Sequence, residues 1–307
     1  MMITYRFTVP GWLRNIGRDL AKMGLLEPKE SWLATMGRWD PEIDRAERGP
    51  EVIISSGGKS VLLGRALSLR FGVPFIYVGE RKPFPSAWFH TYFTPASREL
   101  EANGELLEQI PTALSPMVAR AAAEREGWTA NNLWAMVIGG PSRSHRYREH
   151  DWDALARGMN GLHASHGIRW LVTTSRRTPL SVERRLRKNL DPEAKRYAIW
   201  WNQKPEKKMA AMLGAAEKVY VTQDSMTMVT EAIGSGRPTI ALSPRSVRFP
   251  EDSFLPGYLD RLQERGFLGR ASIDDLETWI HQAPSSPPQA SPTVAMATRL
   301  IERLGWT

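Results

Sequence analysis

Runs of hydrophobic residues alternate with amphipathic segments throughout the second half of the chain. The hydrophobic runs have the length of buried strands and lie at residues 133–138, 168–174, 197–201, 219–222 and 239–242. The segments between them have helical spacing and lie at residues 151–165, 179–189 and 205–213, after residue 225, and at 255–265. Strands separated by helices favour a parallel, doubly wound sheet with right-handed crossovers. The pattern therefore predicts a Rossmann-like domain whose ligand lies at the carboxyl ends of the strands.

The first half of the chain has a less regular pattern. Strands are expected at residues 3–9, 51–55, 73–78 and 89–94, and a helix at 59–71. Residues 103–132 contain two prolines and a helical stretch at 117–125, which is typical of a passage between domains. A Pro- and Ser-rich loop at 284–292 precedes a last helix at 293–304. We therefore expect an N-terminal domain over 1–130, a C-terminal domain over 131–290 and a C-terminal helix within 291–307.

The segment 219–242 is the most informative part of the chain. A β-branched run ends at Asp224-Ser225, two good N-cap residues, and an amphipathic helix follows until glycine closes it. The free N–H groups of such a helix N-terminus bind an anion well at the carboxyl edge of a parallel sheet. Glu231, two turns into the helix, can accept hydrogen bonds from ribose hydroxyls. An ordinary crossover helix with a capped start also explains this spacing.

The other predicted strands of this half are followed by loops rich in anion-binding residues. Three of these loops are Gly139-Gly140-Pro141-Ser142-Arg143, Thr174-Ser175-Arg176-Arg177-Thr178-Pro179 and Asn202-Gln203-Lys204. Because the carboxyl ends of parallel strands share one edge of a sheet, we expect these loops to lie beside Asp224-Ser225. Glycine permits close backbone approach, while hydroxyl groups and arginines donate hydrogen bonds, so the set suits a diphosphate.

Composition and charge narrow the class of partner. A length of 307 residues and a hydrophobic fraction of 42% suit two domains. The absence of cysteine excludes disulfides, thiolate zinc sites and a cysteine nucleophile. We find no signal-peptide pattern and no apolar run long enough to span a membrane, so we expect a cytoplasmic protein. A net charge of +8 favours anionic partners. The basic residues cluster in loops and match no nucleic-acid motif, so we expect no nucleic-acid partner.

Gly57-Gly58-Lys59-Ser60 follows a predicted strand and opens a predicted helix. It resembles a P-loop, but Ile53 occupies the position of the required upstream glycine. Without that glycine the phosphate-wrapping loop cannot form, so we interpret Gly57, Gly58 and Lys59 as a backbone-lined site on the acceptor side.

Two other features have both a catalytic and a structural interpretation. His90, near a predicted strand end, is a candidate catalytic base or a structural histidine. Asp151-Trp152-Asp153 is formally a metal-binding Asp-x-Asp pattern. It precedes an apolar helical run, so one of its carboxylates is better explained as a helix N-cap, and we expect neither a metal nor a cofactor.

The stretch 11–23 predicts a basic amphipathic helix. Trp12, Ile16, Leu20 and Met23 share one side, and Arg14, Arg18 and Lys22 share another. Such a helix packs against its own domain or attaches reversibly to an anionic membrane surface.

Three motifs occur in a fixed order: Ile138-Gly-Gly-Pro-Ser142, Thr174-Ser-Arg-Arg-Thr-Pro179 and Asp224-Ser-x-x-Met-x-x-Glu-Ala232. Together they resemble the family named for the plant elongated-mitochondria fission protein, whose bacterial members are regarded as glycosyltransferases. The resemblance covers residues 50–245 and implies a glycosyltransferase-B-like fold. In that fold two Rossmann-like domains face each other across a cleft, the C-terminal one binds the sugar nucleotide, and a final helix returns to the N-terminal domain. An initial strand with a Gly-rich loop is missing here, which implies a shortened N-terminal domain.

The resulting hypothesis is a metal-independent glycosyltransferase that uses a nucleotide sugar and a cell-envelope, lipid-linked or saccharide acceptor. A non-catalytic membrane-surface scaffold of the same fold and a nucleotide-sugar epimerase-like enzyme are the alternatives. The residues expected to bind the nucleotide sugar are Gly139, Gly140, Ser142, Arg143, Ser175, Arg176, Arg177, Asp224, Ser225, Met226 and Glu231. Contact with the inner face of the membrane is expected to be peripheral.

Overall fold

The computed structural model describes residues 49–58, 60–128, 131–281 and 292–306. The chain divides into two units, residues 1–107 and 108–307, and each has its own parallel sheet. The strand expected at 3–9, the basic helix expected at 11–23 and Lys59 lie outside the described residues. The α/β class predicted from the sequence is confirmed in both units.

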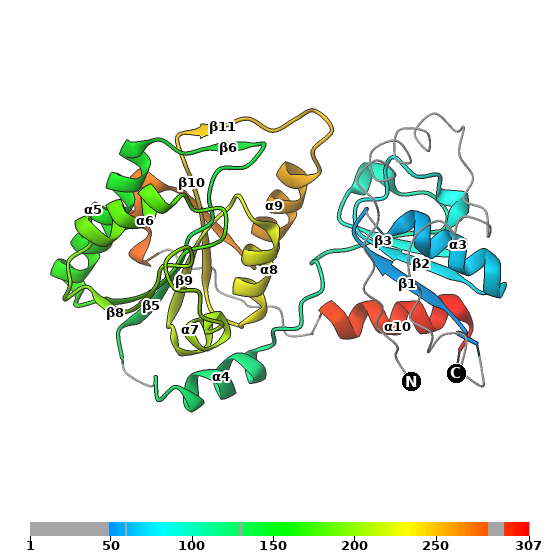
Figure 1. The fold of residues 1–307 in the computed structure, drawn as a ribbon, viewed down its shortest axis with the longest axis horizontal. Helices are drawn as coiled ribbons and strands as arrows, with labels where there is room; N and C mark the ends of the chain where they lie inside the picture. Colours follow the sequence, from blue (N-terminus) through cyan, green and yellow to red (C-terminus); the bar gives the residue numbers. More distant parts are fainter. Residues whose placement is uncertain (1–48, 59, 129–130, 282–291, 307) are drawn as a thin grey trace. The chain divides into compact units, whose positions relative to one another are not determined.

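The first unit contains a four-stranded parallel sheet (Figure 1). Its strands, in spatial order, are β1 (Ile53–Ser56), β2 (Phe75–Val78), β3 (Thr91–Thr94) and β4 (Gly104–Leu106). Helix α3 (Val61–Phe71) packs its apolar side on this sheet, because its buried residues, Leu63, Ala66 and Leu67 among them, share a cluster with the aromatic residues of β2 and β3. The short strand β4 was not predicted, since three residues that include a glycine show no hydrophobic alternation.

The second unit contains a six-stranded, fully parallel sheet. Its strands are β5 (Leu133–Val137), β7 (Arg169–Thr173), β8 (Lys195–Ile199), β9 (Lys218–Thr222), β10 (Thr239–Ser243) and β12 (Gly269–Ser272). Their spatial order is β12-β10-β9-β5-β7-β8. Strands β7 and β8 therefore follow on one side of β5, and the later strands β9, β10 and β12 follow on its other side. The predicted doubly wound sheet is confirmed. Strand β12 was not predicted, because Gly-Arg-Ala-Ser contains no apolar run.

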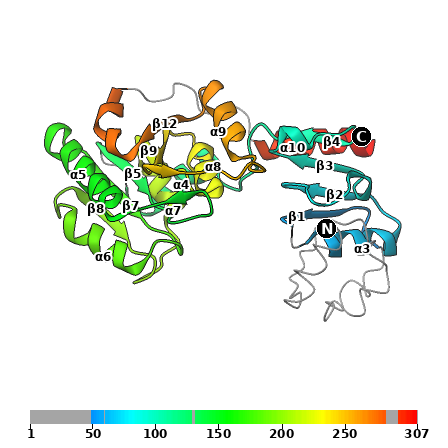
Figure 2. The ribbon, with the colours of Figure 1, turned by 90° about the horizontal axis from the view of Figure 1, so that it is seen from above.

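Helices cover both faces of this second sheet (Figure 2). One face packs against α5 (Glu149–His166), α6 (Leu180–Asn189) and η4 (Ile273–His281). The other packs against α4 (Pro116–Arg125), α7 (Met209–Ala215), α8 (Met226–Gly234) and α9 (Leu255–Glu264). Burial on both faces explains why the strands are continuous apolar runs. A short antiparallel ribbon, β6 (His145–Arg146) with β11 (Ser246–Val247), joins the segments that follow β5 and β10.

Helix α4 belongs to the second unit, although its segment was interpreted as a passage between domains. It packs so closely on α7 that a Cβ at Gly214 would overlap the carbonyl group of Ala119. The two units therefore divide between Leu107 and Glu108, whereas we expected a boundary near residue 130. Proline and alanine composition alone gave no sign of this packing.

The C-terminal helix α10 (Pro292–Leu304) matches the helix expected at 293–304. Near its start, the Thr293 hydroxyl donates a hydrogen bond to the Thr112 carbonyl oxygen at 3.1 Å. Among the helices that the structure describes, none is both long enough and apolar enough to cross a bilayer.

Candidate functional site

The strand order makes the centre of the second sheet the candidate position for a binding site. Strands β5 and β9 are neighbours, and the chain reverses its direction of sheet building between them. In a doubly wound sheet, the loops that follow two such strands separate and leave a crevice at the carboxyl edge. The loop that begins at Ile138 and the segment Gln223–Ser225 follow these two strands.

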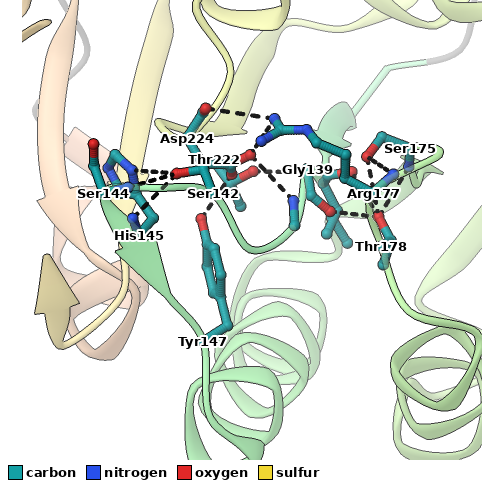
Figure 3. Close-up of polar contacts among 12 residues, drawn as sticks. Gly139, Ser142, Ser144, His145, Tyr147, Ser175, Arg177, Thr178, Thr222 and Asp224 are labelled. Carbon is teal, nitrogen blue, oxygen red and sulfur yellow. Dashed lines mark hydrogen bonds and ion pairs between the residues drawn. The ribbon is translucent and has the colours of Figure 1, made fainter. Parts of the chain in front are cut away.

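Asp224 joins three of the predicted loops through one buried carboxylate (Figure 3). Its Oδ2 accepts hydrogen bonds from the Gly140 N–H at 3.1 Å and from Arg177 Nη2 at 2.5 Å. Its Oδ1 accepts one from the Tyr147 hydroxyl at 2.7 Å. The carboxylate is thus supplied with protein donors and holds the loops together. The N-cap of α8 is Ser225, so Asp224 does not cap the helix as its sequence position allowed.

Gly139 and Gly140 are needed for this arrangement to close. A Cβ on Gly139 would overlap the Asp224 carboxylate, and a Cβ on Gly140 would overlap the Arg177 backbone carbonyl. The Gly139 N–H donates to Thr222 Oγ1 at 2.7 Å. The two glycines therefore allow the loop after β5 to contact the loops after β7 and β9.

The loop after β7 is held by side chains of its own and of the next loop. Thr178 Oγ1 accepts a hydrogen bond from the Ser175 N–H at 3.0 Å and donates to the Gly139 carbonyl. Asn202 Nδ2 donates to the carbonyl oxygens of Thr178 at 2.7 Å and Ser175 at 3.1 Å. Asn202, expected among anion-binding residues, instead fixes the loop that carries the arginines.

Glu183 supports this loop and was missed by the sequence analysis. Its fully buried Oε1 accepts hydrogen bonds from Thr174 Oγ1 at 2.6 Å and from the Asn202 N–H at 3.0 Å. A carboxylate in the first turn of α6 looks like an ordinary complement to the helix dipole, so its sequence position did not reveal this role.

Three arginines on these loops remain able to contact a ligand. Arg177 uses Nη2 on Asp224, and its side chain is 39% exposed. Arg143 and Arg176 are exposed, and neither forms an ion pair with any described residue. Because a guanidinium group has five N–H donors, all three can donate to an anion.

The N-terminus of α8 adds uncapped N–H groups to the same edge. Ser225, the N-cap residue, makes no capping hydrogen bond with its side chain. Met226 begins the helix and packs partly into the core. The Glu231 side chain is half-buried, its carboxylate accepts no hydrogen bond from the part of the chain that the structure describes, and burial raises its pKa.

Two residues beside Asp224 were not identified from the sequence. Burial raises the pKa of Tyr147, so its hydroxyl stays protonated and donates to Asp224. His145 is fully buried, lies edge-on against Phe249 with 5.5 Å between ring centroids, and has a pKa lowered by burial. Its Nδ1 lies 3.2 Å from Ser142 Oγ. The alternation of ring-bearing residues with arginines in His145-Arg146-Tyr147-Arg148 was the available signal in the sequence.

His90 is not at the edge of the first sheet where we expected a base. It precedes β3, whereas Gly57 and Gly58 follow β1, and these strands are parallel. His90 therefore lies at the amino edge and the glycines at the carboxyl edge, which removes the geometric reason for His90 as a base. Gly57 has φ +80°, and a Cβ on Gly58 would meet open space.

Of the two Asp-x-Asp carboxylates, Asp151 stabilises the start of α5 and Asp153 links α5 to α6. Arg148 is the N-cap of this helix, and Asp151 Oδ2 accepts its N–H at 2.7 Å, so neither aspartate is the N-cap residue. Asp153 accepts two hydrogen bonds from Arg185, at 2.7 and 2.8 Å, and this contact lowers the pKa of Asp153.

The family model for mitochondrial fission ELM1 matches residues 5–304. The chain belongs to this family. A relative with that name from Arabidopsis thaliana is 26% identical over 228 residues, which cover 73% of this chain and 50% of the relative. The chain therefore spans about half the length of the curated ELM1 relative that it matches.

Solved structures show which fold this ELM1-family chain adopts. The structure of MnaA of S. aureus with UDP has a TM-score of 0.53 and 12% identity, covering 87% of this chain and 78% of that one. The UDP-GlcNAc 2-epimerase of Neisseria meningitidis bound to UDP-GlcNAc has a TM-score of 0.52 and 11% identity, with coverage of 94% and 89%. The UDP-GlcNAc 2-epimerase of Methanocaldococcus jannaschii has a TM-score of 0.52 and 13% identity, covering 93% of this chain and 90% of that one. The fold is of the glycosyltransferase-B type.

Tyr147→Phe should lower the free energy of unfolding by about 1 to 3 kcal/mol, because a buried bond to a charged acceptor is lost. Tyr220→Phe is the matched control: its hydroxyl is buried without a hydrogen-bond partner among the described residues, so its removal should be neutral or stabilising. Urea unfolding of both variants measures the difference. Equal losses would contradict the role given to Tyr147.

Glu231→Gln should stabilise the unliganded protein at pH 7. The pKa of Glu231 is raised on folding, so the wild type loses stability as pH rises through the window between the unfolded and folded pKa values. Below that window the Glu231 carboxyl is protonated in both the folded and the unfolded state, so the variant should not be more stable than the wild type. Thermal unfolding at pH 4 and pH 7 tests this, and a variant less stable at pH 7 would contradict it.

Proposed function

We propose that the protein binds a nucleotide sugar through its diphosphate at the carboxyl edge of the second sheet. The observation that carries this proposal is the position of Arg177, which Asp224 holds beside the uncapped N-terminus of α8. Backbone N–H groups and arginines are the usual ligands of phosphate groups. Gly139, Gly140 and the hydroxyl groups of Ser142 and Ser175 complete the proposed site.

The same groups suit departure of a nucleoside diphosphate. Negative charge grows on the diphosphate as its bond to the sugar breaks, so Arg143, Arg176 and Arg177 would stabilise the transition state more than the bound substrate. Glu231 lies six residues after Ser225, or about 9 Å along a helix. It would accept hydrogen bonds from the ribose while the helix N-terminus holds phosphate.

The proposed reaction is transfer of the sugar to a cell-envelope, lipid-linked or saccharide acceptor. Gly57, Gly58 and Lys59 would lie on the acceptor side, and the stretch 11–23 would provide reversible contact with the cytoplasmic face of a membrane. The structures of similar fold bind UDP or UDP-GlcNAc, which makes uridine the first base to test.

An epimerase-like reaction is the second candidate, favoured by the fold shared with two UDP-GlcNAc 2-epimerases. Incubation with UDP-GlcNAc, first alone and then with an added acceptor, separates the possibilities. An epimerase changes the sugar without an acceptor, a transferase releases UDP when an acceptor is added, and a non-catalytic scaffold does neither.

Arg143→Ala, Arg176→Ala and Glu231→Ala should each weaken binding of UDP or a UDP-sugar by about 1.5 to 3 kcal/mol, because each removes a hydrogen bond to a charged group. Arg184→Ala, an exposed arginine on α6, is the control and should bind normally. Isothermal titration measures the affinities. Unchanged affinity in all three site variants would exclude this site.

Turnover should survive complete chelation of divalent cations if arginines neutralise the leaving diphosphate. Asp153→Asn should alter stability slightly and leave turnover intact, since Asp153 pairs with Arg185. Activity assays with and without chelator test this expectation. An activity that disappears with chelator and returns with magnesium or manganese would contradict it.

A further inference from the structure

The ribbon formed by β6 and β11 has one face toward the candidate site and one toward solvent. Arg146 pairs with Ser246 and His145 with Val247, and the Arg248 N–H donates to the Ser144 carbonyl oxygen at 2.8 Å. Directly paired residues of an antiparallel ladder share a face, and successive residues alternate between faces. His145 therefore lies on the inner face, while Arg146 and Arg248 lie on the outer face.

Burial and sequence agree with this division. His145 is buried and Tyr147 half-buried, whereas Arg146, Arg148 and Arg248 are exposed. Segments 141–148 and 243–250 contain five arginines and no Asp or Glu, so the ribbon carries no compensating carboxylate of its own. Of these arginines, Arg245 pairs with Asp274 at 2.6 Å. Arg146, Arg148 and Arg248 have no ion-pair partner within the described ranges.

Like charges held together on a short ribbon repel one another, and an anionic partner would relieve this repulsion. Arg146 and Arg148 are two residues apart on one extended segment, about 7 Å. Arg248 is a diagonal neighbour of Arg146 across the ribbon, also about 7 to 8 Å away. Three guanidinium groups thus extend from one flat face, each able to reach a separate phosphate.

We propose that the outer face of the β6–β11 ribbon, made by Arg146, Arg148 and Arg248, binds the phosphate-bearing headgroups of an anionic membrane surface. The surface is distinct from the nucleotide site and from the stretch 11–23. A membrane fits better than a nucleic acid, because the residues on this face are arginines and serines. The face has no aromatic side chain to stack on a base and no amide to read one.

The attachment is electrostatic and reversible. Near the ribbon the structure exposes no large apolar side chain for insertion into a bilayer. Binding should therefore require anionic lipid and fall steeply with salt. The inner face of the same segment contacts Asp224 through Tyr147, so membrane contact would lie directly behind the nucleotide site.

Vesicle flotation of the full chain, without nucleotide, tests the proposal. Vesicles of phosphatidylcholine with phosphatidylserine should bind the protein, and vesicles of phosphatidylcholine alone should not. The triple variant Arg146→Gln, Arg148→Gln, Arg248→Gln should bind about a hundredfold more weakly, since each arginine near an anionic surface contributes roughly fivefold.

The matched control is Arg184→Gln, Lys188→Gln, Arg196→Gln, which removes the same charge from exposed positions on α6 and β8. It should retain most binding, and both variants should keep the wild-type unfolding temperature and UDP affinity. Equal losses in the two variants would overturn the proposal. So would binding that depends only on Arg14 and Arg18, wild-type protein that ignores anionic vesicles, or a preference for single-stranded RNA over them.

Discussion

A buried carboxylate must be supplied with hydrogen-bond donors, and the candidate site is arranged around this requirement at Asp224. Removing a charge from water costs several kcal/mol unless donors and opposite charge replace the solvent. Here the donors are a glycine N–H and a tyrosine hydroxyl of the segment after β5, and an arginine of the loop after β7. Satisfying one charge therefore fixes the relative positions of the loops after β5, β7 and β9.

The two acids of this edge have opposite surroundings. Asp224 receives donors from the protein, whereas Glu231 receives none from the described residues, and burial raises the pKa of Glu231. The first arrangement stabilises the folded loops, and the second leaves a hydrogen-bonding capacity unused. A site that keeps an unsatisfied carboxylate loses stability in the free protein and recovers it when a ligand hydroxyl binds. Under the proposed function, Asp224 positions the loops and Glu231 would bind the ligand.

The sequence predicted what depends on local pattern. Strands β5, β7, β9 and β10 are buried on both faces, so their apolar runs predicted the parallel sheet, and its carboxyl edge followed from topology. Which side chains meet there could not be predicted. Arg177 and Asp224 are separated by 47 residues, and spacing alone cannot distinguish an arginine that binds a carboxylate from one that faces a ligand. The position of His90 could have been predicted, since it stands at the start of the strand expected at 89–94, and strand starts lie at the amino edge of a parallel sheet.

The segment from Ser142 to Arg148 shows how one extended stretch can serve two surfaces. A period of two sends Tyr147 toward Asp224 and leaves Arg146 and Arg148 in solvent. The pairing with β11 fixes the register, and a slip by one residue would bury arginines beside Asp224 and expose His145 and Tyr147. Such a slip is opposed by the hydrogen bond of Tyr147 and by the contact of His145 with Phe249. The contacts that complete the inner site therefore also hold the outer arginines on a single face.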